Sequence, residues 1–153
     1  MESVAIRSAK PADQPGVVEC VDAAYSKYVG RLGGVRPAPM RADYTVLIAE
    51  GSVQVAAYDG DVCGVLVLKP AERHLLIENV AVHPNYQGRG LGQKLMRFAE
   101  QRASEAGLKE VWLYTNELMT ENIAFYEWLS YEEVERQSGE YYRRVYMRKQ
   151  VGP

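Results

Sequence analysis

Residues 75–107 read LLIENVAVHPNYQGRGLGQKLMRFAEQRASEAG, and the rest of the chain can be interpreted around this stretch. The segment 75–82 is mostly apolar, short and rich in branched side chains, which favours a strand. Pro84 has no backbone donor and ends that strand. From Leu91 the apolar side chains recur at helical spacing as far as Ala106, and Gly107 then supplies a left-handed cap. A strand, a glycine loop and a helix in this order are suited to binding an anion.

The glycine loop at residues 88–92 places backbone donors where an anion can reach them. The first turn of a helix leaves N–H groups without intrahelical partners, and the helix dipole adds partial positive charge there. Glycine permits positive φ and lets the backbone approach a ligand closely. A pyrophosphate fills several such donors at once. Arg89 and Lys94 either add charge to this site or are ordinary solvated surface residues.

Two well-known phosphate-binding loops fit this segment poorly. In the triphosphate-binding loop the last glycine is followed by Lys and then Ser or Thr, whereas Gly92 is followed by Gln93. In the dinucleotide fingerprint the glycines are spaced G-x-G-x-x-G and follow the strand directly. Here the third glycine comes one residue early, and residues 83–87 separate the strand from the loop.

The pattern Gln87-x-x-Gly90-x-Gly92, preceded by Val-Ala-Val-His-Pro at 80–84, resembles the acetyl-coenzyme A signature of the GNAT superfamily of N-acetyltransferases. That family's loop is written Q/R-x-x-G-x-G/A, and its fixed positions are all met. The resemblance implies a single GNAT domain over residues 1–153, with acetyl-coenzyme A as cosubstrate. The loop residues it implies for cofactor binding are Gln87, Gly88, Arg89, Gly90, Leu91, Gly92 and Gln93.

The same resemblance implies that the parallel strands at 75–82 and 111–115 splay apart, through a bulge in the first strand near residues 79–82. Splayed strands leave backbone groups unpaired, and the pantetheine arm satisfies them like an added strand. Val80, Ala81 and Val82 are therefore expected to bind the cofactor. A backbone N–H aimed at the acetyl carbonyl also stabilises the oxyanion of the tetrahedral intermediate.

Asn122 and Tyr126 lie one helical turn apart and share a helix face. By resemblance, Asn122 contacts coenzyme A and Tyr126 faces its sulfur, where it protonates the leaving thiolate. The alternative is a structural role, since the chain contains 11 tyrosines. Phe125, Trp128 and Leu129 are expected to be core residues.

Glu78, just before the expected bulge, is the candidate general base. An alkyl ammonium with a pKa of about 10.4 is almost entirely protonated at neutral pH, so the acceptor amine must lose a proton before attack. The alternative is that Glu78 is a solvated residue on a half-exposed strand. No activated cysteine or serine nucleophile is evident, which favours direct attack in a ternary complex over an acetyl-enzyme.

The acceptor is expected to be a primary amine of a small molecule or peptide that the sequence does not identify. In the family pattern, the helices around residues 30–40 form one wall of the acceptor site, where Tyr28, Arg31 and Arg36 are candidate binding residues. A surface connection is the alternative for this segment. Two other functions stay open: a catalytically silent coenzyme A-binding regulatory module of the same fold, and a loop that binds another nucleotide.

The sequence predicts an α/β (α+β) fold with a mixed, mostly antiparallel central sheet of six to seven strands and helices on both faces. Asp59-Gly60 between two β-rich runs is a strong hairpin signal. Residues 30–39 are expected to form a loop, and 46–48 also tolerate a strand. Strands are expected at 4–7, 53–58, 62–68, 75–82, 111–115, 131–136 and 142–148. Helices are expected from Pro11, at 40–50, at 91–106, and after a cap at Thr120. The apolar face of the first helix is expected to contain Val18, Val21, Ala24, Tyr25 and Tyr28.

Composition limits the partners. The 153 residues carry a net charge of -2, which gives no general attraction to nucleic acid or anionic membrane. No apolar run is long enough to span a membrane and no secretory signal is evident, so a cytoplasmic protein is expected. Cys20 and Cys63 are then expected to stay reduced. His74 and His83 lack further ligands at useful spacing, so no metal site is expected. The terminal hairpin leaves a homodimer possible.

Overall fold

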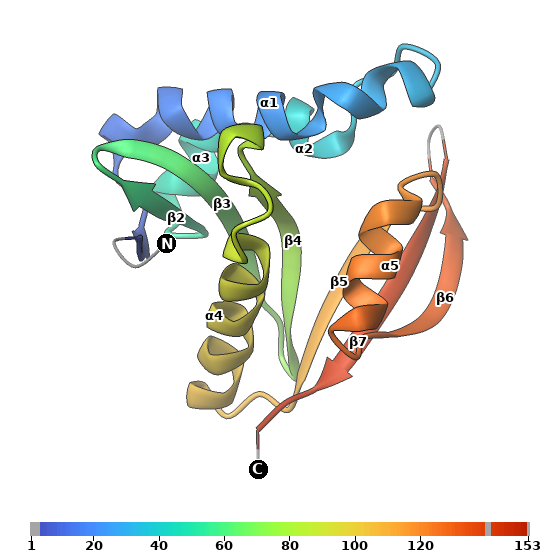
Figure 1. The fold of residues 1–153 in the computed structure, drawn as a ribbon. Helices are drawn as coiled ribbons and strands as arrows, with labels where there is room; N and C mark the ends of the chain where they lie inside the picture. Colours follow the sequence, from blue (N-terminus) through green and yellow to red (C-terminus); the bar gives the residue numbers. More distant parts are fainter. Residues whose placement is uncertain (1–3, 140–141, 153) are drawn as a thin grey trace. The chain divides into compact units, whose positions relative to one another are not determined.

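The structure is a computed structural model that describes residues 4–139 and 142–152. These residues divide into two compact units. The first unit contains the residues up to Leu68 together with Asn79–Arg97, and the second contains Lys69–Glu78 and the residues from Phe98 onward. Figure 1 shows the elements in chain order.

The strands form a mixed sheet. They are β1 (Ala5–Ser8), β2 (Val53–Tyr58), β3 (Asp61–Pro70), β4 (His74–Val82), β5 (Glu110–Asn116), β6 (Glu132–Ser138) and β7 (Arg143–Gln150). The strand order is β1-β2-β3-β4-β5-β7-β6, and β4 contributes residues to both units. Among the pairings described, only β4 with β5 is parallel. The predicted α+β fold with a mostly antiparallel sheet is confirmed.

The hairpin between β2 and β3 follows from its two turn residues. Asp59 has φ +50° and Gly60 has φ +83°, so both central positions are left-handed. That conformation defines the type I′ turn, whose twist matches the twist of the flanking strands. The predicted Asp-Gly turn is confirmed.

A bulge in β3 turns Val62 and Gly64 toward different helices. The register pairs Ala56 with Gly64 but Ala57 with Val62, so Cys63 is the extra residue. The missing Cβ of Gly64 would lie 3.0 Å from Leu95 of α4 (Leu91–Glu105). On the opposite face, a Cβ on Gly16 of α1 (Gln14–Arg31) would lie 3.0 Å from Val62. Both glycines therefore allow close helix–sheet packing.

The start of α1 is preceded by the short 3-10 helix η1 (Pro11–Asp13), so the helix predicted from Pro11 is interrupted once. Its buried face includes Val17 and Cys20, whereas Val18 is only partly buried. Val18 was expected on that face, but Val17 takes the fully buried position and Val18 lies beside it. The buried residues are Val17, Cys20, Val21, Ala24, Tyr25 and Tyr28.

The segment from residue 30 to residue 50 is more helical than predicted. Helix α1 continues through Arg31, and α2 (Ala38–Arg41) begins inside the expected loop. Pro39 lies in the first turn of α2, where its missing N–H would have no intrahelical partner in any case. The expected loop at 30–39 is thus shortened at both ends.

The expected helix at 40–50 is interrupted. Ala42 is extended, with ψ 151°, and ends α2. Asp43 then caps α3 (Tyr44–Ala49), since its side chain accepts a hydrogen bond from the Val46 N–H. The alternative of a strand at 46–48 is wrong, because these residues lie in α3. Asp43 stabilises the helix by accepting a hydrogen bond from the Val46 N–H in its first turn.

Helix α4 ends as predicted. Gly107 has φ +76°, and its N–H donates to the Ser104 carbonyl while the Leu108 N–H donates to the Ala103 carbonyl. These two bonds form the Schellman motif, which satisfies carbonyls that the helix itself leaves open.

The second unit contains β5, β6 and β7 with α5 (Thr120–Trp128). Thr120 was predicted to cap this helix, but Met119 is the N-cap and Thr120 is the first helical residue. The Thr120 hydroxyl donates to Glu121 instead of accepting from the backbone. The terminal hairpin is confirmed in β6 and β7, with Val145 and Met147 buried and Arg144 and Arg148 partly exposed. Part of its expected turn, residues 140 and 141, lies outside the described residues.

Candidate functional site

The glycine loop has the backbone shape that its sequence predicts. Gly88 and Gly90 each have φ +78°, a conformation that side chains with a Cβ rarely adopt. No atom lies within 4 Å of the position that a Cβ would occupy at either residue. Residues Gln87 to Gly90 are exposed. Any residue other than glycine would therefore be strained at positions 88 and 90, and the space beside both glycines is open to a ligand.

Helix α4 starts directly behind this loop. The N–H of Lys94 donates to the Gly90 carbonyl over 3.1 Å, which is the first bond of the helix. The amides of Leu91, Gly92 and Gln93 come before that bond, so the helix gives them no acceptor. With the positive end of the helix dipole, they suit an anion with several oxygens, such as a diphosphate.

The sides of the loop are fixed by side chains of the first unit. The guanidinium of Arg89 lies 5.6 Å from the ring centroid of Tyr86, which also packs edge-on against Tyr58 and His83. Nδ1 of His83 accepts a hydrogen bond from the Asn85 N–H. Arg89 thus adds positive charge beside the loop, on an aromatic support.

Gln87 connects the loop to the end of β4. Its side-chain amide donates a hydrogen bond of 3.1 Å to the Val82 carbonyl. The first residue of the predicted signature therefore positions the loop relative to the strand segment at Val80–Val82, which the sequence analysis assigned to cofactor binding. Both parts lie in the first unit.

A buried hydrogen-bond chain holds the N-terminal helices against β4. The Tyr25 hydroxyl donates to Asn79 Oδ1 (2.8 Å) and lies 3.1 Å from the Val80 carbonyl. Asn79 Nδ2 donates to the Tyr44 hydroxyl, which in turn donates to the Pro39 carbonyl. This chain was not predicted from the sequence. Its signal was Asn79 itself, a polar residue in an apolar strand that must find partners when buried.

The residues expected to contact the acceptor also lie in the first unit. Tyr28 is only 2% exposed, and the Arg31 guanidinium lies 5.0 Å from its ring centroid. Arg36 forms an ion pair of 3.1 Å with Asp22, and both side chains are well exposed. Of these three residues, only the arginines have accessible polar groups.

Helix α5 of the second unit carries Asn122 and Tyr126. Tyr126 is 6% exposed, and its ring packs against Phe125 and Tyr131. The Asn122 amide lies 3.6 Å from the sulfur of Met119. Trp128 was expected in the core, but it is 67% exposed and its ring stacks on that of Phe125.

Glu78 also lies in the second unit, next to Tyr114. Its Oε2 atom is buried and has no hydrogen-bond partner among the described residues. Burial raises the pKa of Tyr114, and the charge of Glu78 raises it further. Glu78 is therefore close to Tyr114 and keeps one carboxylate oxygen without a partner.

The parallel pairing of β4 with β5 is short. Its described register runs from His74↔Glu110 to Ile77↔Leu113, just before Glu78. The pairing of β5 with β7 continues to Asn116↔Arg144. The parallel arrangement is confirmed, while the splaying of the strands and the bulge near residues 79–82 stay predictions.

The predicted site residues are divided between the units. The first unit holds the loop, Val80–Val82 and the helical residues Tyr28, Arg31 and Arg36. The second unit holds Glu78, Asn122 and Tyr126.

Within the described ranges, no three His, Cys, Asp or Glu side chains are grouped so as to hold a metal ion. Over the same ranges, no helix combines the length and apolarity that a membrane crossing needs.

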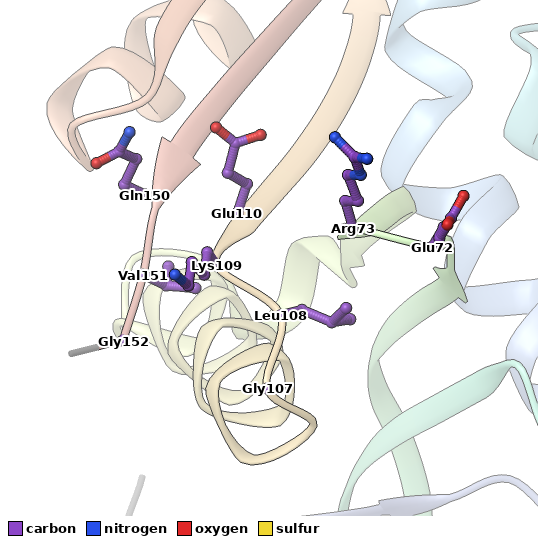
Figure 2. Close-up of a pocket in the computed structure, with 9 residues that line it drawn as sticks. All are labelled: Glu72, Arg73, Gly107, Leu108, Lys109, Glu110, Gln150, Val151 and Gly152. Atoms are coloured by element: carbon purple, nitrogen blue, oxygen red, sulfur yellow. The ribbon is translucent and has the colours of Figure 1, made fainter.

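A hollow of about 860 Å³ lies elsewhere in the second unit, where β4 and β5 begin and β7 ends. Figure 2 shows Glu110 and Gln150, which are paired across β5 and β7, pointing the same way beside it. None of the predicted site residues lines this hollow.

Comparison with known proteins agrees with the motif. Residues 22–131 match the family model described as the acetyltransferase (GNAT) family. The chain is 33% identical over 72 residues to probable N-acetyltransferase 14 of Xenopus tropicalis, covering 45% of the chain and 35% of that protein. It is 34% identical over 74 residues to streptothricin acetyltransferase of Streptomyces lavendulae, covering 47% of the chain and 36% of that protein. These matches span about a third of each relative.

The fold resembles a solved acetyltransferase over nearly its full length. The structure of PaiA N-acetyltransferase from Thermoplasma acidophilum in complex with coenzyme A matches with a TM-score of 0.82. The match covers 97% of this chain and 99% of that chain, at 17% sequence identity. At this identity the likeness concerns the fold.

Proposed function

Because the chain belongs to the GNAT family of acetyltransferases, we propose that it transfers the acetyl group of acetyl-coenzyme A to a primary amine of a small molecule or peptide. One observation carries the choice of cosubstrate. Two left-handed glycines with open space beside them lead into the start of α4, whose first amides have no acceptor within the helix. These donors suit the diphosphate of coenzyme A.

The proposal gives each candidate residue its own role toward the cosubstrate. The backbone amides from Gly88 to Gln93 and the charge of Arg89 bind the diphosphate. The backbone of Val80, Ala81 and Val82 pairs with the amides of the pantetheine arm. Asn122 contributes a side-chain amide to the cofactor. Gln87 supports binding indirectly, because its side chain holds the loop against Val82.

The proposed reaction is a direct transfer. The amine nitrogen attacks the thioester carbonyl carbon, and a C–N bond forms while the carbonyl oxygen becomes an oxyanion that a β4 backbone N–H stabilises. The proton of the amine passes to Glu78, directly or through one water, and then to solvent. The oxyanion re-forms the carbonyl as the C–S bond breaks, and the departing thiolate takes a proton from Tyr126, which regains one from solvent.

The cysteines support direct transfer over an acetyl-enzyme. Cys20 and Cys63 are both fully buried. Burial raises the pKa of the Cys20 thiol to about 12, and it also raises the pKa of Cys63. Both residues therefore stay as thiols near neutral pH, and the thiolate is the nucleophilic form.

The acceptor site is proposed to include the exposed arginines of the first unit. Arg31 and Arg36 supply positive charge near the end of α1, and the buried ring of Tyr28 supports Arg31. The ion pair of Arg36 with Asp22 is exposed, so an acceptor anion can compete for it at low cost.

A mass-spectrometric screen of amines with acetyl-coenzyme A tests the proposed function. The wild-type protein is expected to acetylate at least one amine. Glu78→Gln should lower kcat by roughly 100-fold, as the loss of a general base does. Tyr126→Phe should lower kcat by about tenfold, because an ordinary thiolate with a pKa of about 8.5 already leaves well.

Glu72→Gln and Tyr58→Phe are the matched controls, since both residues are exposed and neither belongs to the proposed site. Both should keep wild-type turnover, and all four variants should bind coenzyme A as the wild type does. Coenzyme A binding without turnover of any amine would instead indicate a silent binding module. Absence of coenzyme A binding would overturn the proposal.

A further inference from the structure

Two opposite charges lie on either side of Tyr114 in the second unit. Glu78 is close enough to raise the pKa of the Tyr114 hydroxyl, and the Arg144 guanidinium lies 4.6 Å from the Tyr114 ring centroid. The Tyr146 ring, 5.6 Å from that of Tyr114, extends the same surface. The Tyr114 ring thus has the Glu78 carboxylate near its hydroxyl and the Arg144 guanidinium over its face.

The strand register explains why these groups share one face. Glu78 follows Ile77, the partner of Leu113, so it stands beside Tyr114 on the neighbouring strand. Tyr114 is paired with Tyr146 on β7, and Arg144 lies two residues before Tyr146. Residues two apart on a strand point to the same face. Since β5 separates β4 from β7, the two charged residues come from strands that lie about 10 Å apart where all three strands are paired.

Neither charge is neutralised by the other described residues. The buried Glu78 Oε2 has no hydrogen-bond partner there, and no described carboxylate forms an ion pair with Arg144. The interaction of Arg144 with Tyr146 raises the pKa of the guanidinium, which stays charged. A charged guanidinium with donors to spare recognises a carboxylate well.

We propose that the acceptor is an amine that also carries a carboxylate, with the amine beside Glu78 and the carboxylate bound by Arg144 across the Tyr114 ring. This inference rests on the proposed function and narrows its substrate class to amino acids and amino-acid-like compounds. The separation of the two strands favours acceptors whose amine and carboxylate are several bonds apart.

Paired acceptors test this inference. Initial rates are measured with glycine, 4-aminobutanoate and 6-aminohexanoate, and with the primary amide of each, which keeps the amine but loses the carboxylate charge. For the wild type, kcat/KM should be at least tenfold higher for the longer acids than for their amides. Arg144→Gln should remove this preference by lowering kcat/KM for the acids alone.

Arg148→Gln is the matched control, because Arg148 lies on the same strand and covers Trp112 instead of Tyr114. It should keep the preference for acids. Arg144→Lys serves as a second variant that retains the charge, and it should recover part of the preference. Circular dichroism and thermal unfolding confirm that each variant is folded.

Three results overturn the inference, and they are distinguishable. Equal wild-type rates for acids and amides contradict it while leaving the proposed function intact. An equal loss for acids and amides in Arg144→Gln shows that Arg144 is structural. Absence of acetylation for every amine overturns the proposed function, and the inference falls with it.

Discussion

The hydroxyl of Tyr25 donates a hydrogen bond of 2.8 Å to Oδ1 of Asn79, and both side chains are buried. Asn79 in turn donates to Tyr44. One polar residue of β4 therefore fixes both α1 and α3, directly beside the strand segment proposed to bind the pantetheine arm. The shape of that part of the first unit depends on this amide.

Removing the amide should destabilise the protein. Asn79→Ala removes one hydrogen bond from each of two buried hydroxyls, those of Tyr25 and Tyr44, and we expect the free energy of unfolding to fall by about 2 to 3 kcal/mol. Tyr25→Phe should cost about 1 to 2 kcal/mol, because Asn79 Oδ1 loses its donor. Urea unfolding measures both changes. Tyr58→Phe is the control at an exposed tyrosine and should stay within about 0.5 kcal/mol of wild type; a similar small effect at Asn79 would contradict this role.

Ser130 is in a conformation that favours glycine. It has φ +75°, and it ends α5 with the same two hydrogen bonds that Gly107 makes at the end of α4. The Ser130 N–H donates to the Glu127 carbonyl, and the Tyr131 N–H donates to the Tyr126 carbonyl. A left-handed residue with a Cβ costs about 1 kcal/mol at such a position.

We therefore expect Ser130→Gly to raise the free energy of unfolding by roughly 0.5 to 1 kcal/mol. Gly107→Ala makes the reverse change at a matched site and should lower it by about 1 kcal/mol. Denaturant unfolding measures both. A destabilised Ser130→Gly protein would show that the serine side chain stabilises this turn.

Stability should depend on pH through Asp13. Arg7 donates two hydrogen bonds to its carboxylate, of 2.7 and 3.1 Å, and the Lys10 N–H donates a third. The Arg7 guanidinium lowers the pKa of Asp13 in the folded protein. In the unfolded chain the pKa is about 3.9, so this stabilisation is complete above that pH and is lost as the pH falls through the folded value.

Asp13→Asn should therefore lower the free energy of unfolding by about 1 kcal/mol at pH 7. The difference from wild type should shrink below about pH 4, where the wild-type carboxylate itself becomes protonated. Asp22→Asn removes an exposed ion pair and should change stability by less than about 0.5 kcal/mol at any pH. A pH-independent effect of Asp13→Asn would rule out the ionic contribution.

The fold could be predicted from the sequence wherever a local signal had one physical meaning. Asp59-Gly60 specified a hairpin, and Gly107 specified a helix end, because each residue tolerates a backbone that few others adopt. The predicted cap at Thr120 was wrong, since Met119 takes the cap position and the Thr120 hydroxyl bonds to Glu121. Capping preference is weak when a neighbouring side chain offers another partner.

The candidate site was predictable in part for the same reason. Gly88 and Gly90 favour a left-handed backbone, and both residues have positive φ in the structure. Asn79, Tyr25 and Tyr44 could not be joined from sequence, because their contacts depend on how distant segments pack. Arg144 and Tyr114 come together only through the β5–β7 register, which a sequence pattern does not fix.

Calorimetric titration with coenzyme A tests the central claim, that its diphosphate binds at the glycine loop, most directly. The variants are Gly88→Ala and Gly90→Ala, with Gly60→Ala as the control, because all three glycines have positive φ and open space around the added methyl group. We predict that the two loop variants weaken coenzyme A binding at least tenfold, while Gly60→Ala binds like the wild type. Unchanged affinity in folded Gly88→Ala and Gly90→Ala proteins would contradict the claim.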